Sequence, residues 1–267
     1  MVLSIDAGIL ALGVIFLTAL SRKWTLPRGK SAALIAIGTA TGGIALGLCL
    51  RSSPPLVLLV PAVWLCQLVG YVAVLAWLFY RDPDRAMPAD SGGIVSPADG
   101  KVIYIRKLTA GTIPVAEKKG RSLMLADLAQ SKLSDHELWQ IGISMVFTDV
   151  HVNRAPIAGK VTLVQRRPGR FLSLRDDDAV GVNERQTLVI ENQDVQIGLV
   201  QIASRLVRRI VAYVVPGESV AAGQRIGMIK FGSQVDLFIP VKQCPSLRVD
   251  VSDLLVAGVT PIGVIAR

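Results

Sequence analysis

The chain has 267 residues, enough for one large domain or two small ones. A hydrophobic content of 51% and a mean hydropathy of +0.50 exclude an ordinary soluble domain, and the excess lies at the front, where only five of the 29 Lys and Arg and one of the 20 Asp and Glu precede Tyr80. The net charge of +9 suits an anionic membrane surface, whereas nucleic acid is disfavoured because no run of Lys and Arg carries interleaved aromatics.

The three cysteines give no sign of a metal site or a disulfide framework. Cys49 and Cys66 fall in the apolar front part, and Cys244 stands beside Pro245. Their spacing matches no metal-ligand motif, so the sequence predicts a reducing compartment and no bound metal.

Three apolar stretches predict a membrane anchor over residues 1–80. Residues 56–80 contain no charge and are long enough to span a ~30 Å hydrocarbon core. Residues 32–50 are also uncharged, and their glycines (Gly38, Gly42, Gly43 and Gly47) suit close helix packing in lipid. The stretch at 7–20 is the shortest, so we expect two to three transmembrane helices. A buried helical hairpin of a soluble protein is the alternative.

Basic residues predict the orientation of these helices. The loop after the first stretch carries Arg22, Lys23, Arg28 and Lys30, whereas the second loop carries only Arg51. By the positive-inside rule the first loop is cytoplasmic. Counting spans then places residues 81–267 on the cytoplasmic side of a multi-pass protein in the cell membrane.

Residues 81–267 predict a mainly β domain. After the charged juncture at residues 81–85, β-branched runs alternate with turn residues; these runs lie at 102–105, 141–147, 161–164, 187–190 and 195–202. Residues 204–213 are compatible with a short helix or a strand. Residues 107–140 are polar and are interpreted as an insertion or mobile loop with a helix at about 122–132.

A weak internal repeat indicates a barrel-sandwich with lipoyl- or biotinyl-like hairpins. PADGKV at residues 97–102 is echoed by PIAGKV at 156–161, and a later Gly-punctuated run extends from Pro216 to Ile229. An attachment lysine of the Met-Lys-Met type is missing from the expected hairpin tip. A swinging-arm carrier is therefore disfavoured, because a shared scaffold does not imply shared chemistry.

Two histidines are the candidates for a general base. His136 lies in a polar patch and is expected at the surface. His151 stands at the end of an apolar strand, with Asp149 on the same face of an extended chain and the polar residues Asn153 and Arg154 close behind. This concentration makes His151 the better candidate, although a structural role is equally compatible with the pattern.

Two turns supply the other candidates. Asp99 lies before Gly100, which is ordinary turn chemistry. Gly232 and Ser233 lie between two apolar runs and resemble a turn as well, but the glycine carbonyl is open to attack and the serine hydroxyl becomes a nucleophile when a base takes its proton. Asp99, His151 and Ser233 thus form a candidate acid–base–nucleophile set, and the sequence leaves open whether the three meet.

Five blocks of sequence resemble the phosphatidylserine decarboxylases, specifically their short membrane-anchored form. They are FYRDPDR at residues 79–85, SPADGKV at 96–102, DVHVNRAP at 149–156, NER at 183–185 and GMIKFGS at 227–233. Their common order over nearly all of residues 79–240 makes the resemblance specific.

The resemblance implies a self-processing proenzyme. Ser233 attacks Gly232, and the chain is cut into a β chain of residues 1–232 and an α chain of residues 233–267 whose serine becomes a covalent pyruvoyl cofactor. A Schiff base to this group lets phosphatidylserine lose CO2 and yields phosphatidylethanolamine. Asp99 and His151 are taken to drive the cleavage. The implied partners are the anionic phospholipid, the membrane and the two chains of one precursor, with a homodimer left open.

One position departs from the family pattern. Longer members carry two histidines in the third block, whereas Arg154 stands three residues after His151 here. One histidine must serve both steps, or another acid reprotonates the carbanion. Arg154 and Asn153 are candidates for binding the substrate carboxylate or phosphate, with a structural salt bridge as the equal alternative for Arg154.

Two other functions stay open at this point. The first is a membrane-anchored barrel-sandwich adaptor without chemistry, in which residues 232 and 233 form a mere turn. The second is a decarboxylase of a related serine-headed lipid, such as an ether-linked archaeal one, because the chemistry acts only on the serine.

Overall fold

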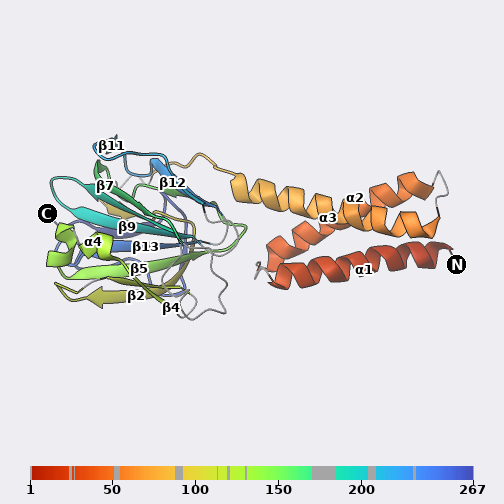
Figure 1. Cartoon of the computed structure of the whole chain (residues 1–267), viewed down its shortest axis with the longest axis horizontal. Helices are drawn as coiled ribbons and strands as arrows, with labels where there is room; N and C mark the ends of the chain where they lie inside the picture. The colour runs from red at the N-terminus through yellow and green to blue at the C-terminus, as the bar shows by residue number, and fades with distance from the viewer. Residues whose placement is uncertain are drawn as a thin grey trace. The chain divides into compact units, whose positions relative to one another are not determined.

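The computed structural model forms two compact units, a helical unit of Met1–Arg81 with Val146–Thr148, and a β unit of Asp82–Met145 with Asp149–Arg267 (Figure 1). The residues that the structure describes are 2–23, 26, 28–50, 55–87, 93–112, 114–118, 121–129, 131–169, 184–203, 209–230 and 233–266.

Three helices make up most of the helical unit: α1 (Val2–Lys23), α2 (Arg28–Leu50) and α3 (Leu56–Tyr80). By length and composition, Arg28–Cys49 and Leu58–Tyr80 can each cross a bilayer, whereas the apolar part of α1, Ala7–Arg22, is shorter. Two apolar helices of spanning length are therefore established, and the spanning itself stays a prediction.

Glycines allow the helices to approach each other closely. A Cβ atom on Gly42 of α2 would lie 2.2 Å from Cγ of Gln67 in α3, and one on Gly38 would lie 2.9 Å from Cδ1 of Leu17 in α1. Gly43 and Gly47, in contrast, have open space beside them. Two of the four glycines singled out from the sequence, Gly38 and Gly42, thus serve the packing that the sequence predicts.

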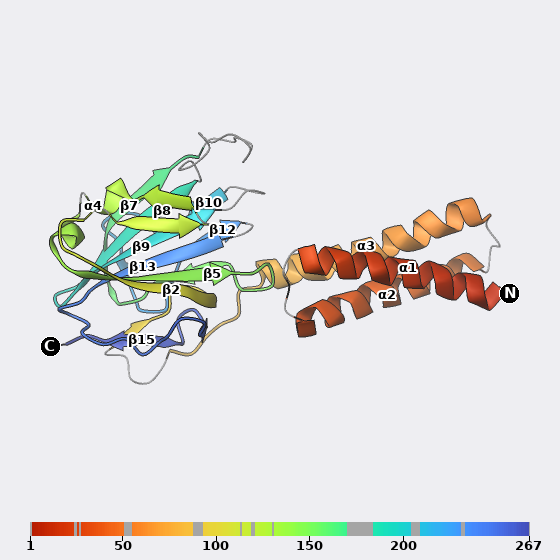
Figure 2. The same ribbon diagram turned by 90° about the horizontal axis from the view of Figure 1, so that it is seen from below.

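The largest sheet of the β unit curls into a half-barrel (Figures 1 and 2). Across it, in order and all antiparallel, lie β11 (Ser219–Val220), β7 (Gly159–Arg167), β8 (Arg185–Glu191), β9 (Gln196–Ala203), β13 (Ser233–Pro240), β5 (Leu138–Met145), β2 (Gly100–Leu108) and β14 (Leu254–Leu255). Strand β13 lies in the interior of the sheet, paired with β5 on one side and β9 on the other. The predicted mainly β character is confirmed, and each of the five predicted β runs overlaps one of these strands, although the run at 141–147 extends two residues beyond the end of β5.

Two smaller sheets close the main core. One contains β10 (Arg209–Ala212), β12 (Arg225–Lys230) and β6 (Val152–Arg154), and the other pairs β1 (Gly93–Val95) with β15 (Pro261–Val264). Ile143 and Val235 of the large sheet share one buried cluster with Ile229, Ile94 and Ile262 of the small sheets. The apolar faces of all three sheets therefore meet in a single core.

The two sequence-related segments occupy equivalent positions. They bond reciprocally, because Val95 N–H donates to the Pro156 carbonyl and Arg154 N–H donates to the Pro97 carbonyl, both at 2.9 Å. The repeat extends to their partner strands: β14 pairs with the start of β2 as β11 pairs with the start of β7. The β unit is thus built partly from two copies of one motif, while its likeness to lipoyl domains stays a prediction.

Residues 107–140 form a covering layer in place of the expected mobile loop. They include β3 (Val115–Lys118), β4 (Arg121–Met124), the one-turn α4 (Ala126–Ala129) and a 3-10 helix (Lys132–Asp135) between the ends of β2 and β5. The expected helix at 122–132 is therefore wrong apart from that turn. The reason is the apolar side chains of Leu125, Leu128 and Leu133, which are buried against Val200 and Phe238 on the outer face of the large sheet.

The segment at 204–213 is settled only in part. Residues 209–212 form strand β10, which pairs with β12. Residues 204–208 lie outside the described residues, so the choice between helix and strand is answered for the second half alone.

Candidate active site

A buried turn carries Asp99. The Ser96 hydroxyl donates to the Ala98 carbonyl at 2.7 Å, which closes the turn. Gly100 follows with φ of +142°, and a Cβ atom there would lie 2.4 Å from the Ser144 carbonyl oxygen. Only glycine fits this position, so the Asp-Gly pair fixes where the carboxylate emerges.

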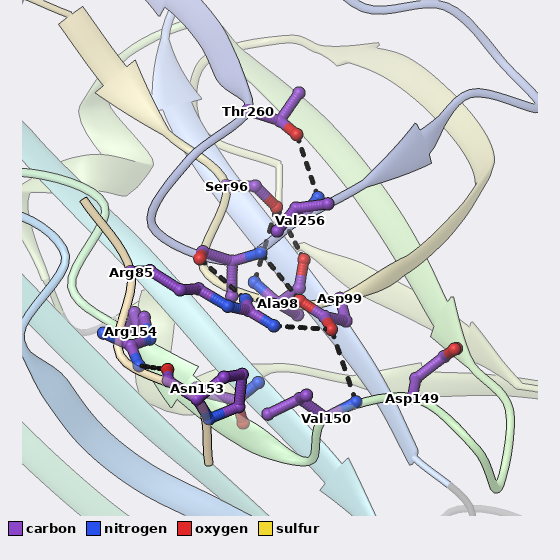
Figure 3. A network of polar contacts seen from close by, with 12 residues as sticks. Arg85, Ser96, Ala98, Asp99, Asp149, Val150, Asn153, Arg154, Val256 and Thr260 are labelled. Carbon is purple, nitrogen blue, oxygen red and sulfur yellow. Dashed lines mark hydrogen bonds and ion pairs between the residues drawn. The ribbon is translucent and has the colours of Figure 1, made fainter. Parts of the chain in front are cut away.

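The Asp99 carboxylate joins three segments of the β unit. Arg85 donates to it in bidentate fashion, with Nη1 2.6 Å from Oδ1 and Nη2 2.8 Å from Oδ2 (Figure 3). Two backbone N–H groups complete the shell: Ala257 donates to Oδ1 at 2.8 Å and Val150 to Oδ2 at 3.3 Å. A guanidinium and two amide donors hold this carboxylate in one orientation.

His151 is the residue after Val150, whose N–H binds Asp99. Its side chain is fully buried, and its Nδ1 lies 2.8 Å from the Asp149 carbonyl oxygen. A carbonyl oxygen only accepts, so Nδ1 must carry a proton. In the neutral ring Nε2 is then the basic nitrogen, which is the tautomer that a general base needs.

Strand pairing connects His151 with the predicted cleavage region. The His151 carbonyl accepts the N–H of Ile229 in β12 at 3.2 Å, and β12 ends at Lys230. Gly232 lies outside the described residues, and of Ser233 the structure describes the backbone alone. That backbone opens β13, opposite Met145 of β5 and Ala203 of β9.

The structure therefore brings together two of the three predicted catalytic residues. Asp99 and His151 are connected through the Val150 amide, and His151 is bonded to the strand that leads toward Gly232. The meeting of both with Ser233 stays a prediction.

Arg154 is bound by protein acceptors through the two terminal nitrogens of its guanidinium, Nη1 and Nη2. Its guanidinium donates to the carbonyls of Gly223 and Pro83, both at 3.0 Å, and to Oδ1 of Asp82 at 3.1 Å. Burial lowers its pKa, an effect that the nearby Asp82 carboxylate opposes. These contacts hold the residue in place, and its role in substrate binding stays a prediction.

Asn153 takes part in a chain of buried amides. Its Oδ1 accepts from Gln201 at 2.8 Å, and Gln201 Oε1 accepts from Gln186 at 2.7 Å. Its Nδ2 lies 3.4 Å from the Pro97 carbonyl. This chain links the histidine block to β8 and β9, and substrate binding by Asn153 likewise stays a prediction.

The sequence did not reveal that residues 82–85 belong to the site. Asp82 pairs with Arg154 and also with Arg225, while Arg85 pairs with Asp99. The alternating charges of this segment were a signal, but a Pro-containing charged run suggests a linker equally well. His136, in contrast, is exposed as expected.

A second buried polar cluster lies on the outer face of the large sheet. Asp236 of β13 is fully buried and accepts from Tyr104 Oη at 2.7 Å, Gln140 Nε2 at 2.8 Å and Gln234 Nε2 at 2.7 Å. Burial and the neighbouring Asp236 carboxylate raise the pKa of Tyr104. This cluster ties the start of β13 to β2 and β5.

Comparison with known proteins identifies the family. The profile described as phosphatidylserine decarboxylase matches residues 73–263. The chain belongs to the phosphatidylserine decarboxylase family. It is similar to the phosphatidylserine decarboxylase proenzymes of Erythrobacter litoralis (43% identity over 67% of this chain and 69% of that protein), Azorhizobium caulinodans (40% over 71% and 73%) and Ruegeria pomeroyi (39% over 71% and 78%).

The family match confirms the resemblance drawn from the sequence blocks. It begins within α3 and includes Asp99, His151 and Ser233, so the β unit is the part that the phosphatidylserine decarboxylase family shares with this chain. The residues of α1 and α2 precede the matched range.

Proposed function

We propose that this chain is a self-processing phosphatidylserine decarboxylase that converts phosphatidylserine to phosphatidylethanolamine. The observation that supports this most directly is the family match over the whole β unit up to residue 263. The geometry agrees with it, because the Asp99 carboxylate accepts from the N–H of Val150, whose neighbour in the chain is the buried His151, and the tautomer of His151 suits a base.

Self-cleavage requires only groups of the chain itself. His151 Nε2 takes the Ser233 hydroxyl proton while the oxygen attacks the Gly232 carbonyl, and the peptide C–N bond breaks to give an ester and a free amine. Loss of the Ser233 α-proton then expels the Gly232 carboxylate and leaves dehydroalanine, whose hydrolysis releases ammonia and leaves a pyruvoyl group on residue 233. The products are the β chain of residues 1–232 and the α chain of residues 233–267.

The site suits such a group in its backbone setting. Residue 233 opens β13 and is paired with Met145 and Ala203, so a new chain end there would stay anchored by strand pairing after the cut. Such a group would supply a ketone that can accept the amine of the serine head group and an electron sink for the loss of CO2. We assign the return of a proton to the carbanion to His151.

We further propose that the helical unit anchors the enzyme in the cell membrane as a multi-pass segment, with the β unit on the cytoplasmic side. The spanning length of α2 and α3 and the four basic residues near the first loop support this. Under this proposal the substrate comes from the lipid phase in which the anchor lies. Acyl- and ether-linked substrates share the serine head group and are to be compared in the same assay.

A gel and the intact mass of the purified full-length protein test the proposal. The wild type should yield two chains cut after Gly232, the smaller one bearing a keto group at its end. Ser233→Ala should stay uncut and inactive, and His151→Ala should cut about 10²- to 10⁴-fold more slowly because it lacks the base. His136→Ala is the matched control and should cut normally. An uncut wild-type chain would favour the adaptor function, and normal cutting of His151→Ala would refute our assignment of the base.

A further inference from the structure

Arg85 contacts the site, but the proposed cleavage reaction gives it no role. Its side chain is only 10% exposed, and its guanidinium donates to both oxygens of Asp99 and, through Nη1, to the Ala257 carbonyl at 2.8 Å. It therefore contacts two of the segments that meet at the site, the Asp99 turn and the loop before β15 (Figure 3).

The contacts of Arg85 form a closed arrangement around Asp99. Ala257 N–H donates to Asp99 Oδ1, while the Ala257 carbonyl accepts from the same guanidinium. The loop is fixed to the Asp99 turn a second time, because Gly258 N–H donates to the Ser96 carbonyl at 2.7 Å. Oδ1 thus accepts from Arg85 and Ala257, and Oδ2 accepts from Arg85 and from the N–H of Val150.

The Val150 contact is where this arrangement reaches the catalytic residues. Val150 N–H lies 3.3 Å from Asp99 Oδ2, and the next residue is His151. Without the bidentate guanidinium, the Asp99 side chain gains rotamer freedom and the amide loses a fixed acceptor. The bond from the Ile229 N–H to the His151 carbonyl lies on the β12 side and does not replace this contact.

We propose that Arg85 is a positioning residue for self-cleavage: its bidentate pair with Asp99 fixes the acceptor of Val150 N–H and thereby the place of His151. This inference rests on the proposed function, in which His151 is the base. Lysine cannot replace arginine fully at such a site, because an ammonium is a point charge and does not bind two carboxylate oxygens side by side.

The test measures the rate of self-cleavage of the full-length precursor, synthesised in a cell-free reaction with lipid nanodiscs. Arg85→Ala should cut about 100-fold more slowly, the order of loss expected for a displacement of about 1 Å in a catalytic group. Millimolar guanidinium chloride, far below denaturing levels, should restore at least about tenfold of this, since the planar ion can refill the vacated position. The cleavage rate of Arg85→Lys should lie between those of the wild type and of Arg85→Ala.

A second comparison separates positioning through Asp99 from an independent effect. Asp99→Asn removes the ion pair from the other side, so adding Arg85→Ala to it should slow cleavage little further. Arg106→Ala is the matched control, because Arg106 also pairs with a carboxylate, Glu117 at 2.7 Å, but on an exposed surface. It should cut at the wild-type rate.

Each outcome supports or overturns the inference. Slow cutting by Arg85→Ala, recovery with guanidinium and no further loss in the double variant support it. Cutting at the wild-type rate overturns it, and so does slow cutting that neither guanidinium nor Arg85→Lys improves, which indicates a folding role. An uncut wild-type chain overturns the proposed function itself, so the two failures are told apart by the wild-type sample.

Discussion

Asp236→Asn is expected to destabilise the β unit by about 4 kcal/mol. The carboxylate accepts three hydrogen bonds in a fully buried position, from Tyr104, Gln140 and Gln234. The isosteric amide has one acceptor oxygen, so even in its better orientation it meets the Gln234 amide with an N–H group. One charge-assisted bond, worth about 1.5–3 kcal/mol, is then lost, an unsatisfied donor costs about 1–3 kcal/mol more, and the two remaining bonds weaken.

Thermal unfolding of the full-length protein in detergent measures this loss. For a unit of this size, about 4 kcal/mol corresponds to a decrease in Tm of about 8–16 °C. Glu117→Gln is the control: the exposed Glu117–Arg106 pair should contribute at most about 1 kcal/mol. A Tm of Asp236→Asn within about 3 °C of the wild type would refute the reasoning, because the three donors would then have found other acceptors.

Three further predictions concern stability and reactivity. Leu133→Ala should cost about 3 kcal/mol in the free energy of unfolding, since Leu133 is fully buried in the outer layer; a loss below about 1 kcal/mol would show that the layer is dispensable. The pKa of Tyr104 is higher in the folded protein than in the unfolded chain, so its contribution to stability is complete below the unfolded pKa and is lost as the pH rises above that value. Tyr104→Phe should therefore reduce the fall in stability above about pH 10. An alkaline unfolding transition that is unchanged in this variant would contradict the prediction. Burial raises the pKa of Cys244, so in a chain without Cys49 and Cys66 its thiol should react with a disulfide reagent only after unfolding; fast labelling of the folded protein argues against this burial.

The sequence was sufficient for the parts of the fold that depend on local pattern. Alternating β-branched residues predicted the strands around Ile143 and Val189, and the repeated Pro-x-x-Gly motif predicted two segments that the structure places in equivalent positions. Residues 107–140 were misjudged because a few leucines among polar residues are enough to cover a sheet face. Only the sheet itself, which carries the apolar side chains of Val200 and Phe238 on that face, shows why these leucines are needed.

The site was predicted in its residue types but not in its connections. Asp99 and His151 stood out by composition and by resemblance to the phosphatidylserine decarboxylases. Their link runs through a backbone amide of Val150, which no side-chain pattern reveals. Arg85 was overlooked for a similar reason. Its pairing with Asp99 depends on the backbone conformation of the residues after α3, and a charged residue near a helix end can equally well be a solvated surface residue.

The interior position of β13 in the sheet bears on whether folding or chain cleavage comes first. This strand pairs with β5 over eight residues and with β9 over six, and it begins at the residue where the α chain would start. A separate peptide of residues 233–267 would have to insert between β5 and β9 in the interior of the sheet, so the two chains should not assemble when they are synthesised apart. Under the proposed self-cleavage, the precursor would therefore fold first and cut second, and the cut pair, once formed, should come apart only by unfolding.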